Sequence, residues 1–231
     1  MGLPKLDIQR FKHKLTGIDK VVSYRPFTVK EQKILLMAKE SQSREEEIDA
    51  MCQIIELCTF GEVDAKTLPV FDVEDLFIRI RSKSVSDVCE IGYKVIDTDE
   101  KVKLTIPLEE VTVYIDPEHE KKFMLTDTIG VVMKYPTLGM AFDDSGDKVK
   151  QDDTMIKACI DYVFDEDQIY HFNEFSEEEV EEWLESFDTH TLKKIAKFFA
   201  TMPSVYYKTE VELSDGRKTE VELRGIHNFF G

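Results

Sequence analysis

The hydrophobic pattern of the first sixty residues predicts a hairpin followed by two helices. Residues from about 6 to 27 alternate apolar and polar side chains around Gly17, as the two strands of a hairpin do. Two capping boxes then open helices whose apolar residues recur at helical spacing. These boxes are formed by Thr28 with Glu31 and by Ser43 with Glu46.

The period of the pattern changes after a third predicted helix. We expect Asp72 to be the N-cap of that helix. From residue 88 to 115 apolar side chains instead recur at every second position, with a polar turn at 97–101, which predicts an antiparallel hairpin. The segment 124–142 fits either a strand or a helix, and Pro136 ends either one.

The last third of the chain repeats the order of helices followed by a hairpin. The expected elements are a linker at 143–153, a helix at about 154–164, a helix opened by the capping box of Ser176 and Glu179, a helix around 192–199, and a hairpin turning at Asp215-Gly216. The sequence therefore predicts an α+β fold in which helices pack on antiparallel hairpins. The expected lobes are residues 1–142 and 154–231.

The hairpins of the two halves align position by position. Tyr93-Lys94 matches Tyr207-Lys208, and Ile106, Leu108 and Val111 match Val221, Leu223 and Ile226. A weak internal duplication explains this match, and so does the general similarity of amphipathic hairpins. The sequence alone leaves both explanations open.

Composition and charge narrow the class of protein. Hydrophobic residues make up 42% of the 231 residues, which is enough to build a core. The formal net charge of -17 repels a nucleic-acid backbone, so we expect no nucleic-acid partner. The four cysteines lack metal or redox spacing, and no stretch resembles a signal peptide or a membrane span. We therefore expect a cytoplasmic protein with free thiols and no membrane partner.

The motifs that carry catalytic mechanisms are missing from the sequence. It contains no phosphate-binding glycine loop, no paired metal-binding histidines and no nucleophile elbow. The histidines are isolated, and the carboxylate-rich run at 174–186 is typical of a solvent-exposed helix face. We expect no enzyme activity, no catalytic residue, no metal site and no cofactor.

Aromatic residues beside turns are the remaining candidates for a binding surface. They occur in YRPF at 24–27, KYPTL at 134–138 and HNFF at 227–230. Each has a core interpretation and a docking interpretation, because a rigid aromatic side chain also loses little entropy on binding. The candidate partner-binding residues are Tyr24, Pro26, Phe27, Tyr135, Pro136, Ile226, Phe229 and Phe230.

The same stretches, taken in order, resemble a known family. The chain resembles the baseplate hub family of T-even-type bacteriophages from about residue 20 to the C-terminus. The resemblance rests on the phrases YRPFTVKEQKILLMA, IIELCTFG, DVEDLFIRIRSKSV, KYPTL and GIHNFF, taken together. Some relatives carry cysteine pairs like those of a zinc ribbon in the hairpins. This sequence lacks them at 96–101 and 213–218, so the resemblance implies no metal there.

The resemblance implies a role in assembling the hub at the tip of the contractile tail. Hub proteins and the tape-measure protein are then the expected partners, in the host cytoplasm or in the virion tail baseplate. Three functions stay open: a chaperone-like assembly factor, a structural hub component retained in the virion, and an acidic inhibitor that mimics nucleic acid. The high charge favours the assembly factor, because such a protein can shield an aggregation-prone partner. Homo-oligomer formation also stays open.

Overall fold

A computed structural model describes residues 7–95, 98–142 and 153–230. Its helices and small antiparallel sheets form the α+β fold that the sequence predicts. The packing divides the chain into unit 1, residues 1–114 with 204–231, and unit 2, residues 115–203. The C-terminal hairpin thus packs with the N-terminal half, and these units differ from the lobes expected at 1–142 and 154–231. Residues 143–152 of the expected linker lie outside the described residues.

The first hairpin of unit 1 is confirmed around Gly17. Its strands are β1 (Phe11–Leu15) and β2 (Lys20–Tyr24), which pair antiparallel from Phe11 opposite Tyr24 to Leu15 opposite Lys20. Glycine is required at the turn, because a Cβ atom on Gly17 would lie 2.7 Å from a carboxylate oxygen of Asp72. The hairpin therefore approaches α3 more closely than any side chain would allow.

Both predicted capping sites open helices, α1 (Val29–Ser41) and α2 (Arg44–Cys58). Thr28 and Glu31 form the complete capping box, and the Ser43 hydroxyl accepts a hydrogen bond from the backbone N–H of Glu46. The 3-10 turn η1 (Ala65–Thr67) follows α2. The local sequence is sufficient to place these helix starts because each cap satisfies backbone donors that the helix leaves free.

Glu31 is a buried carboxylate that joins the start of α1 to Arg25. Its carboxylate lies 3.0 Å from an Arg25 guanidinium nitrogen and accepts hydrogen bonds from the backbone N–H and the hydroxyl of Thr28. Burial by itself raises the pKa of Glu31, but the hydrogen bonds from Arg25 and Thr28 outweigh it and lower the pKa from 4.5 to about 2. The folded chain therefore favours ionised Glu31.

Acid should destabilise unit 1 partly through Glu31. Because its folded pKa lies below its unfolded value, its stabilising contribution is complete above about pH 4.5 and is lost as the pH falls toward about 2. We expect Glu31→Gln to lower the free energy of unfolding at neutral pH and to flatten its decline across this window, measured by denaturant titration at several pH values. Parallel pH profiles for both proteins would contradict this assignment.

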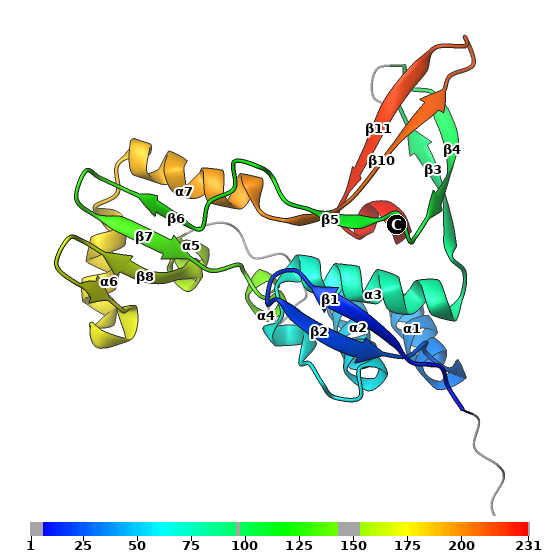
Figure 1. The fold of residues 1–231 in the computed structure, drawn as a ribbon, viewed down its shortest axis with the longest axis horizontal. Coiled ribbons are helices and arrows are strands. Elements are labelled where there is room, and N and C mark those ends of the chain that lie inside the picture. The colour runs from blue at the N-terminus through cyan, green and yellow to red at the C-terminus, as the bar shows by residue number, and fades with distance from the viewer. Residues whose placement is uncertain (1–6, 96–97, 143–152, 231) are drawn as a thin grey trace, which may run out of the picture. The chain divides into compact units, whose positions relative to one another are not determined.

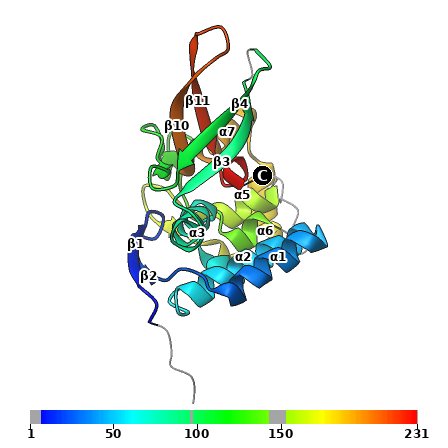
Figure 2. The same ribbon diagram turned by 90° about the vertical axis from the view of Figure 1, so that its right-hand side faces the viewer.

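Helix α3 (Val70–Ser84) lies at the centre of unit 1, between the β1–β2 hairpin with α1 and α2 on one side and the two long hairpins on the other (Figure 2). The prediction that Asp72 is its N-cap is wrong. The helix begins three residues earlier than this prediction, with Pro69 at the N-cap position, and Asp72 is fully buried in its first turn. The carboxylate instead accepts hydrogen bonds from the backbone N–H groups of Thr16 and Gly17, at 2.9 and 3.0 Å, so a tertiary contact has replaced the local cap.

The two long hairpins of unit 1 are confirmed, and they share one core (Figure 1). They are β3 (Val88–Lys94) with β4 (Lys101–Pro107), and β10 (Ser204–Glu212) with β11 (Lys218–Arg224). The expected first hairpin extended to residue 115, but β5 (Thr112–Tyr114) pairs with β10 instead. Two of the aligned pairs, Ile106 with Val221 and Leu108 with Leu223, lie in this shared core. Their burial tests neither the internal duplication nor the general similarity of amphipathic hairpins.

The turns of the two hairpins are also joined. The Ser214 backbone N–H and hydroxyl donate to the two carboxylate oxygens of Glu100, at 2.9 and 3.1 Å. The short helix α8 (His227–Phe230) follows β11, and the Phe229 side chain is fully buried in the shared core. Hydrogen bonds at the tip and apolar packing at the base therefore hold the hairpins together.

Unit 2 is built on a four-stranded antiparallel sheet with the order β6-β7-β8-β9. Its strands are β6 (Lys122–Met124), β7 (Gly130–Met133), β8 (Ile160–Phe164) and β9 (Ile169–Tyr170). Its helical elements are α4 (Leu138–Ala141), α5 (Asp153–Cys159), η2 (Phe172–Glu174), α6 (Glu177–Glu185) and α7 (Thr189–Thr201).

Two sequence predictions in unit 2 have different outcomes. The capping box of Ser176 and Glu179 is confirmed at the start of α6. The helix predicted at 154–164 is wrong in its second half, because α5 ends at Cys159 and residues 160–164 form strand β8. Ile160, Tyr162 and Val163 favour a strand, and β7 supplies the partner that makes it one. The ambiguous segment 124–142 contains both types, strand β7 and helix α4.

Candidate functional site

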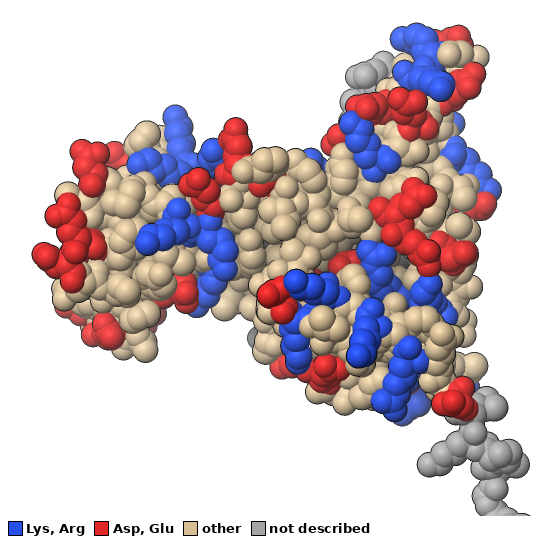
Figure 3. Space-filling model, in the orientation of Figure 1, with Lys and Arg blue, Asp and Glu red and all other residues tan. Residues whose placement is uncertain are grey.

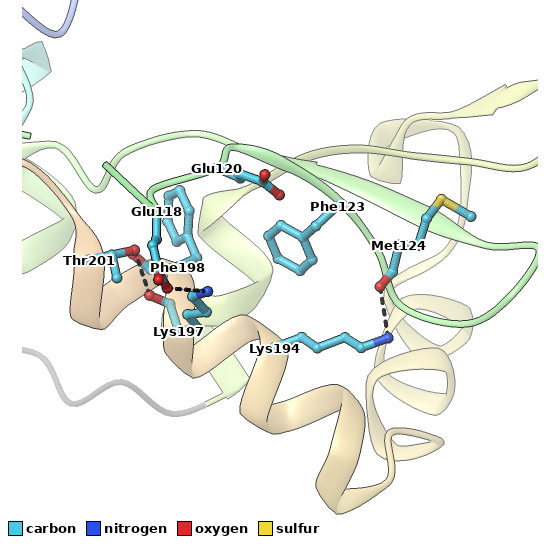
Figure 4. Close-up of a pocket in the computed structure, with 8 residues that line it drawn as sticks. All are labelled: Glu118, Glu120, Phe123, Met124, Lys194, Lys197, Phe198 and Thr201. Atoms are coloured by element: carbon cyan, nitrogen blue, oxygen red, sulfur yellow. Dashed lines mark hydrogen bonds and ion pairs between the residues drawn. The ribbon is translucent and has the colours of Figure 1, made fainter. Parts of the chain in front are cut away.

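A pocket of about 230 Å³ opens between α7 and the segment that leads into β6 (Figure 4). Phe123 and Met124 line one side, and four side chains of α7 line the other. The full lining is Glu118, Glu120, Phe123, Met124, Lys194, Lys197, Phe198 and Thr201. The lining therefore combines two aromatic rings, Phe123 and Phe198, with four charged side chains.

Three of the four charged side chains of this pocket, Glu118, Lys194 and Lys197, have partners within unit 2. The Lys194 ammonium donates to the backbone carbonyls of Met124 and Leu125, at 3.0 and 2.8 Å. Lys197 forms an ion pair with Glu118 at 2.9 Å. These contacts fasten α7 to β6 and its preceding segment, which indicates a structural role for both lysines.

His119 lies beside the pocket in an aromatic stack. Its ring centroid lies 5.6 Å from that of Tyr135 and 5.2 Å from that of Phe198. Its Nδ1 lies 2.9 Å from the Thr201 hydroxyl and its Nε2 lies 3.1 Å from the Tyr135 hydroxyl. Burial lowers the pKa of His119, so the neutral ring is favoured. Hydroxyl groups engage both ring nitrogens, so these contacts and the aromatic stack fix the His119 ring between Tyr135 and Thr201.

A second, more apolar groove of about 300 Å³ lies between the β8–β9 end of the sheet and α6. Its walls are mainly aromatic: Tyr170 from β9, Phe172 from η2, and Trp183 from α6. The rings of Phe172 and Trp183 meet edge to face at a centroid distance of 5.7 Å. The other lining residues are Ile129, Val163, Asp165, Phe175, Glu179 and Val180.

The groove lies in the most acidic stretch of the chain. Every Asp, Glu, Lys or Arg between Lys157 and Lys193 is an Asp or a Glu. Acidic side chains accordingly gather at the end of unit 2 that carries the β8–β9 loop and α6 (Figure 3). An apolar groove at this end therefore has a negatively charged border.

The described residues provide no assembled metal centre, and the four cysteine thiols are buried. Among them, no group of three or more His, Cys, Asp or Glu is placed to hold a metal ion. Burial raises the pKa of all four cysteine thiols, to about 11 for Cys52, Cys58 and Cys159. Protonated, buried thiols are poor nucleophiles. None of the helices within the described ranges is long and apolar enough to cross a membrane.

The candidate residues predicted from aromatic turns fall into different environments. In unit 1, Tyr24 is buried, Pro26, Phe27 and Ile226 are half-buried, and Phe229 is fully buried. Phe229 is therefore a core residue rather than an open docking side chain, and the side chain of Phe230 lies outside the described residues.

Of the two candidates in unit 2, Tyr135 stacks against Phe198, which lines the first pocket. Tyr135 is half-buried beside His119, with the Lys121 ammonium 4.8 Å from its ring centroid, and Pro136 is buried. The aromatic groove was not predicted. Its only sequence signal is the apolar stripe of α6, with Val180 and Trp183, which normally indicates a core-facing side.

The comparisons with known proteins identify one family. The family model described as T4 bacteriophage base plate protein matches residues 8–231, which include both units. No curated protein and no solved structure matches the chain significantly. The match spans nearly the whole chain, so the chain belongs to the T4 bacteriophage base plate protein family.

Proposed function

We propose that the chain is a non-enzymatic assembly factor that binds hub proteins or the tape-measure protein while the baseplate hub is built. The observation that carries a role in the baseplate is the family match over residues 8–231, which covers residues of both compact units. The described residues add surfaces suited to binding and no recognisable reaction centre.

Exposed apolar side chains supply the contact surface that such a role needs. On α1, the side chains of Val29, Leu36 and Met37 are more than half exposed. In unit 2, Phe175 is exposed in the lining of the aromatic groove, and Ile169 is exposed on β9. Large apolar side chains that a protein leaves in water are typical of surfaces that a partner later covers.

The net charge favours temporary binding over permanent incorporation. A formal charge of -17 keeps the free chain soluble and discourages its self-association while it holds an apolar partner. A structural hub component retained in the virion is the second candidate function, and the family match supports it equally.

A nucleic-acid mimic is the third candidate function. The distribution of charge on the surface of the hairpins does not support it. Their carboxylates alternate with lysines, as in the ion pairs of Lys103 with Glu90 at 2.7 Å and Lys208 with Glu220 at 2.8 Å. A mimic of a phosphate backbone needs a continuous negative row instead.

The first two functions predict different fates for a tagged chain encoded by the phage. An assembly factor should co-purify with hub or tape-measure proteins from infected cells and be missing from purified virions. A retained component should instead appear in virions at a fixed ratio to other baseplate proteins. If the chain neither co-purifies with baseplate proteins nor enters virions, both functions are wrong. An equally acidic, tagged protein without relation to the tail serves as the control.

A further inference from the structure

We propose that the aromatic groove of unit 2 binds a basic segment of a partner protein, inserting an apolar side chain between Tyr170, Phe175 and Trp183. This inference deepens the proposed function by naming a surface and the chemistry of the segment it takes. The groove is defined by its lining residues given above, all of which belong to unit 2.

The groove is preformed, because contacts within unit 2 hold its walls. Tyr170 donates a hydrogen bond from its hydroxyl to the Asp165 carboxylate at 2.6 Å, which fixes the β9 wall. Trp183 packs edge to face against Phe172 on one side and Phe187 on the other, with centroid distances of 5.7 and 4.7 Å. A partner side chain that enters therefore requires little reorganisation of the groove.

The groove is also incompletely covered. The Phe175 side chain, which lines the groove, is 42% exposed. The floor, by contrast, is made of buried Val163 and Val180. A volume of about 300 Å³ accommodates one or two large apolar side chains, which suits a short peptide anchor.

The negative charge at the border of the groove favours a basic partner segment. The two acidic side chains that line the groove are Asp165 and Glu179, which accept hydrogen bonds from the Tyr170 hydroxyl and from the Ser176 backbone N–H. The stretch between Lys157 and Lys193 adds further Asp and Glu and contributes no Lys or Arg. An acidic segment would be repelled from this border, whereas Lys or Arg residues flanking an apolar anchor would be attracted to it.

Trp183 gives a direct readout, because it is the only tryptophan of the chain and lines the groove. The probe is a short synthetic peptide with a Leu-Phe pair flanked by lysines. We expect it to shift Trp183 fluorescence in a saturable manner, with an affinity that falls as salt rises. A peptide with glutamates in place of the lysines, and one with serines in place of Leu-Phe, should each bind roughly tenfold more weakly or worse.

A pair of matched variants locates the binding site. Phe175→Ala removes an exposed side chain of the groove, and Leu192→Ala removes one of similar exposure, 41%, elsewhere in unit 2. We expect Phe175→Ala to weaken the lysine peptide roughly tenfold and Leu192→Ala to leave its affinity unchanged. Calorimetry gives the affinity independently of Trp183.

Several results would overturn the proposal. The first is that the lysine peptide does not bind. The second is that the glutamate peptide binds equally well, which would indicate a groove for apolar ligands in general. The third is that the two variants weaken binding equally.

The tagged chain separates this inference from the proposed function. If Phe175→Ala captures baseplate proteins from infected cells as well as the unmodified chain does, the groove assignment fails while the assembly role stands. If the unmodified chain captures none, the assembly role fails.

Discussion

Replacing Phe229 with alanine should lower the free energy of unfolding of unit 1 by about 3–5 kcal/mol, the range measured for truncating a buried phenylalanine. The side chain is fully buried in the core that the two long hairpins share, and the Cys89 thiol donates a hydrogen bond to its backbone carbonyl. The substitution removes an aromatic ring that helps to hold strands β3 and β11 against each other. Few substitutions elsewhere in unit 1 should cost more.

This loss is measured best by a method that separates the two units. Because the only tryptophan, Trp183, lies in unit 2, its fluorescence reports mainly on that unit. Hydrogen exchange of peptides from 88–107 and 204–224 follows unit 1 directly. The control is Phe60→Ala, which truncates a phenylalanine that is 48% exposed and should cost at most about 1 kcal/mol, chiefly its cation–π contact with Arg10.

The outcome also decides how the end of the chain contributes to function. If Phe229→Ala destabilises unit 1 no more than Phe60→Ala does, the core assignment is wrong. The HNFF segment would then be interpreted as a docking segment, and Phe229→Ala would be expected to reduce partner binding. If the loss is large, reduced partner binding by this variant says nothing about a C-terminal docking surface.

The elements that the sequence predicted correctly are those set by nearby residues. Thr28 and Ser176 start helices through caps that span three residues, and the Asp215-Gly216 turn closes a hairpin between two alternating strands. Each of these signals works within one turn or one hairpin. Local pattern alone therefore sufficed for about half of the regular elements and for the fold class.

The errors arise where a distant segment supplies the deciding contact. Asp72 has the sequence signal of an N-cap, but the amides of Thr16 and Gly17 engage it instead. Residues 160–164 have mixed propensity, and β7 makes them a strand. Pairing partners that lie tens of residues away leave no mark in a local pattern, so both errors follow from the same cause.

The aromatic groove was missed for a related reason. Sequence periodicity correctly shows that Val180 and Trp183 lie on the apolar side of α6, but it does not show how completely the sheet covers that side. Val180 is buried at the floor of the groove, whereas Trp183 is only partly buried and lines the groove together with Phe172 and Tyr170. The difference between core and groove is one of shape, and shape depends on how η2 and β9 are placed.

Replacing Arg79 with methionine should destabilise unit 1 by about 3–5 kcal/mol, because it removes the partner of several buried polar groups at once. The guanidinium lies 3.0 Å from an Asp75 carboxylate oxygen and donates to the backbone carbonyls of Leu108 and Val111. It thereby joins α3 to the loop between β4 and β5. Methionine keeps much of the apolar stem of the side chain but leaves the Asp75 charge and both carbonyls without this donor.

A double variant tests whether the buried charge of Asp75 is responsible for part of that loss. The Asp75 side chain is only 3% exposed, and its other oxygen lies 2.6 Å from His13 Nε2. Adding Asp75→Asn to Arg79→Met should recover part of the lost free energy of unfolding, because a neutral amide is less costly to bury than an unpaired carboxylate. As a control, Arg44→Met affects an ion pair whose arginine side chain is 55% exposed and should change stability by at most about 0.5 kcal/mol. Strictly additive effects of Arg79→Met and Asp75→Asn in denaturant titrations would show that the two side chains stabilise unit 1 independently, contrary to the geometry of their contact.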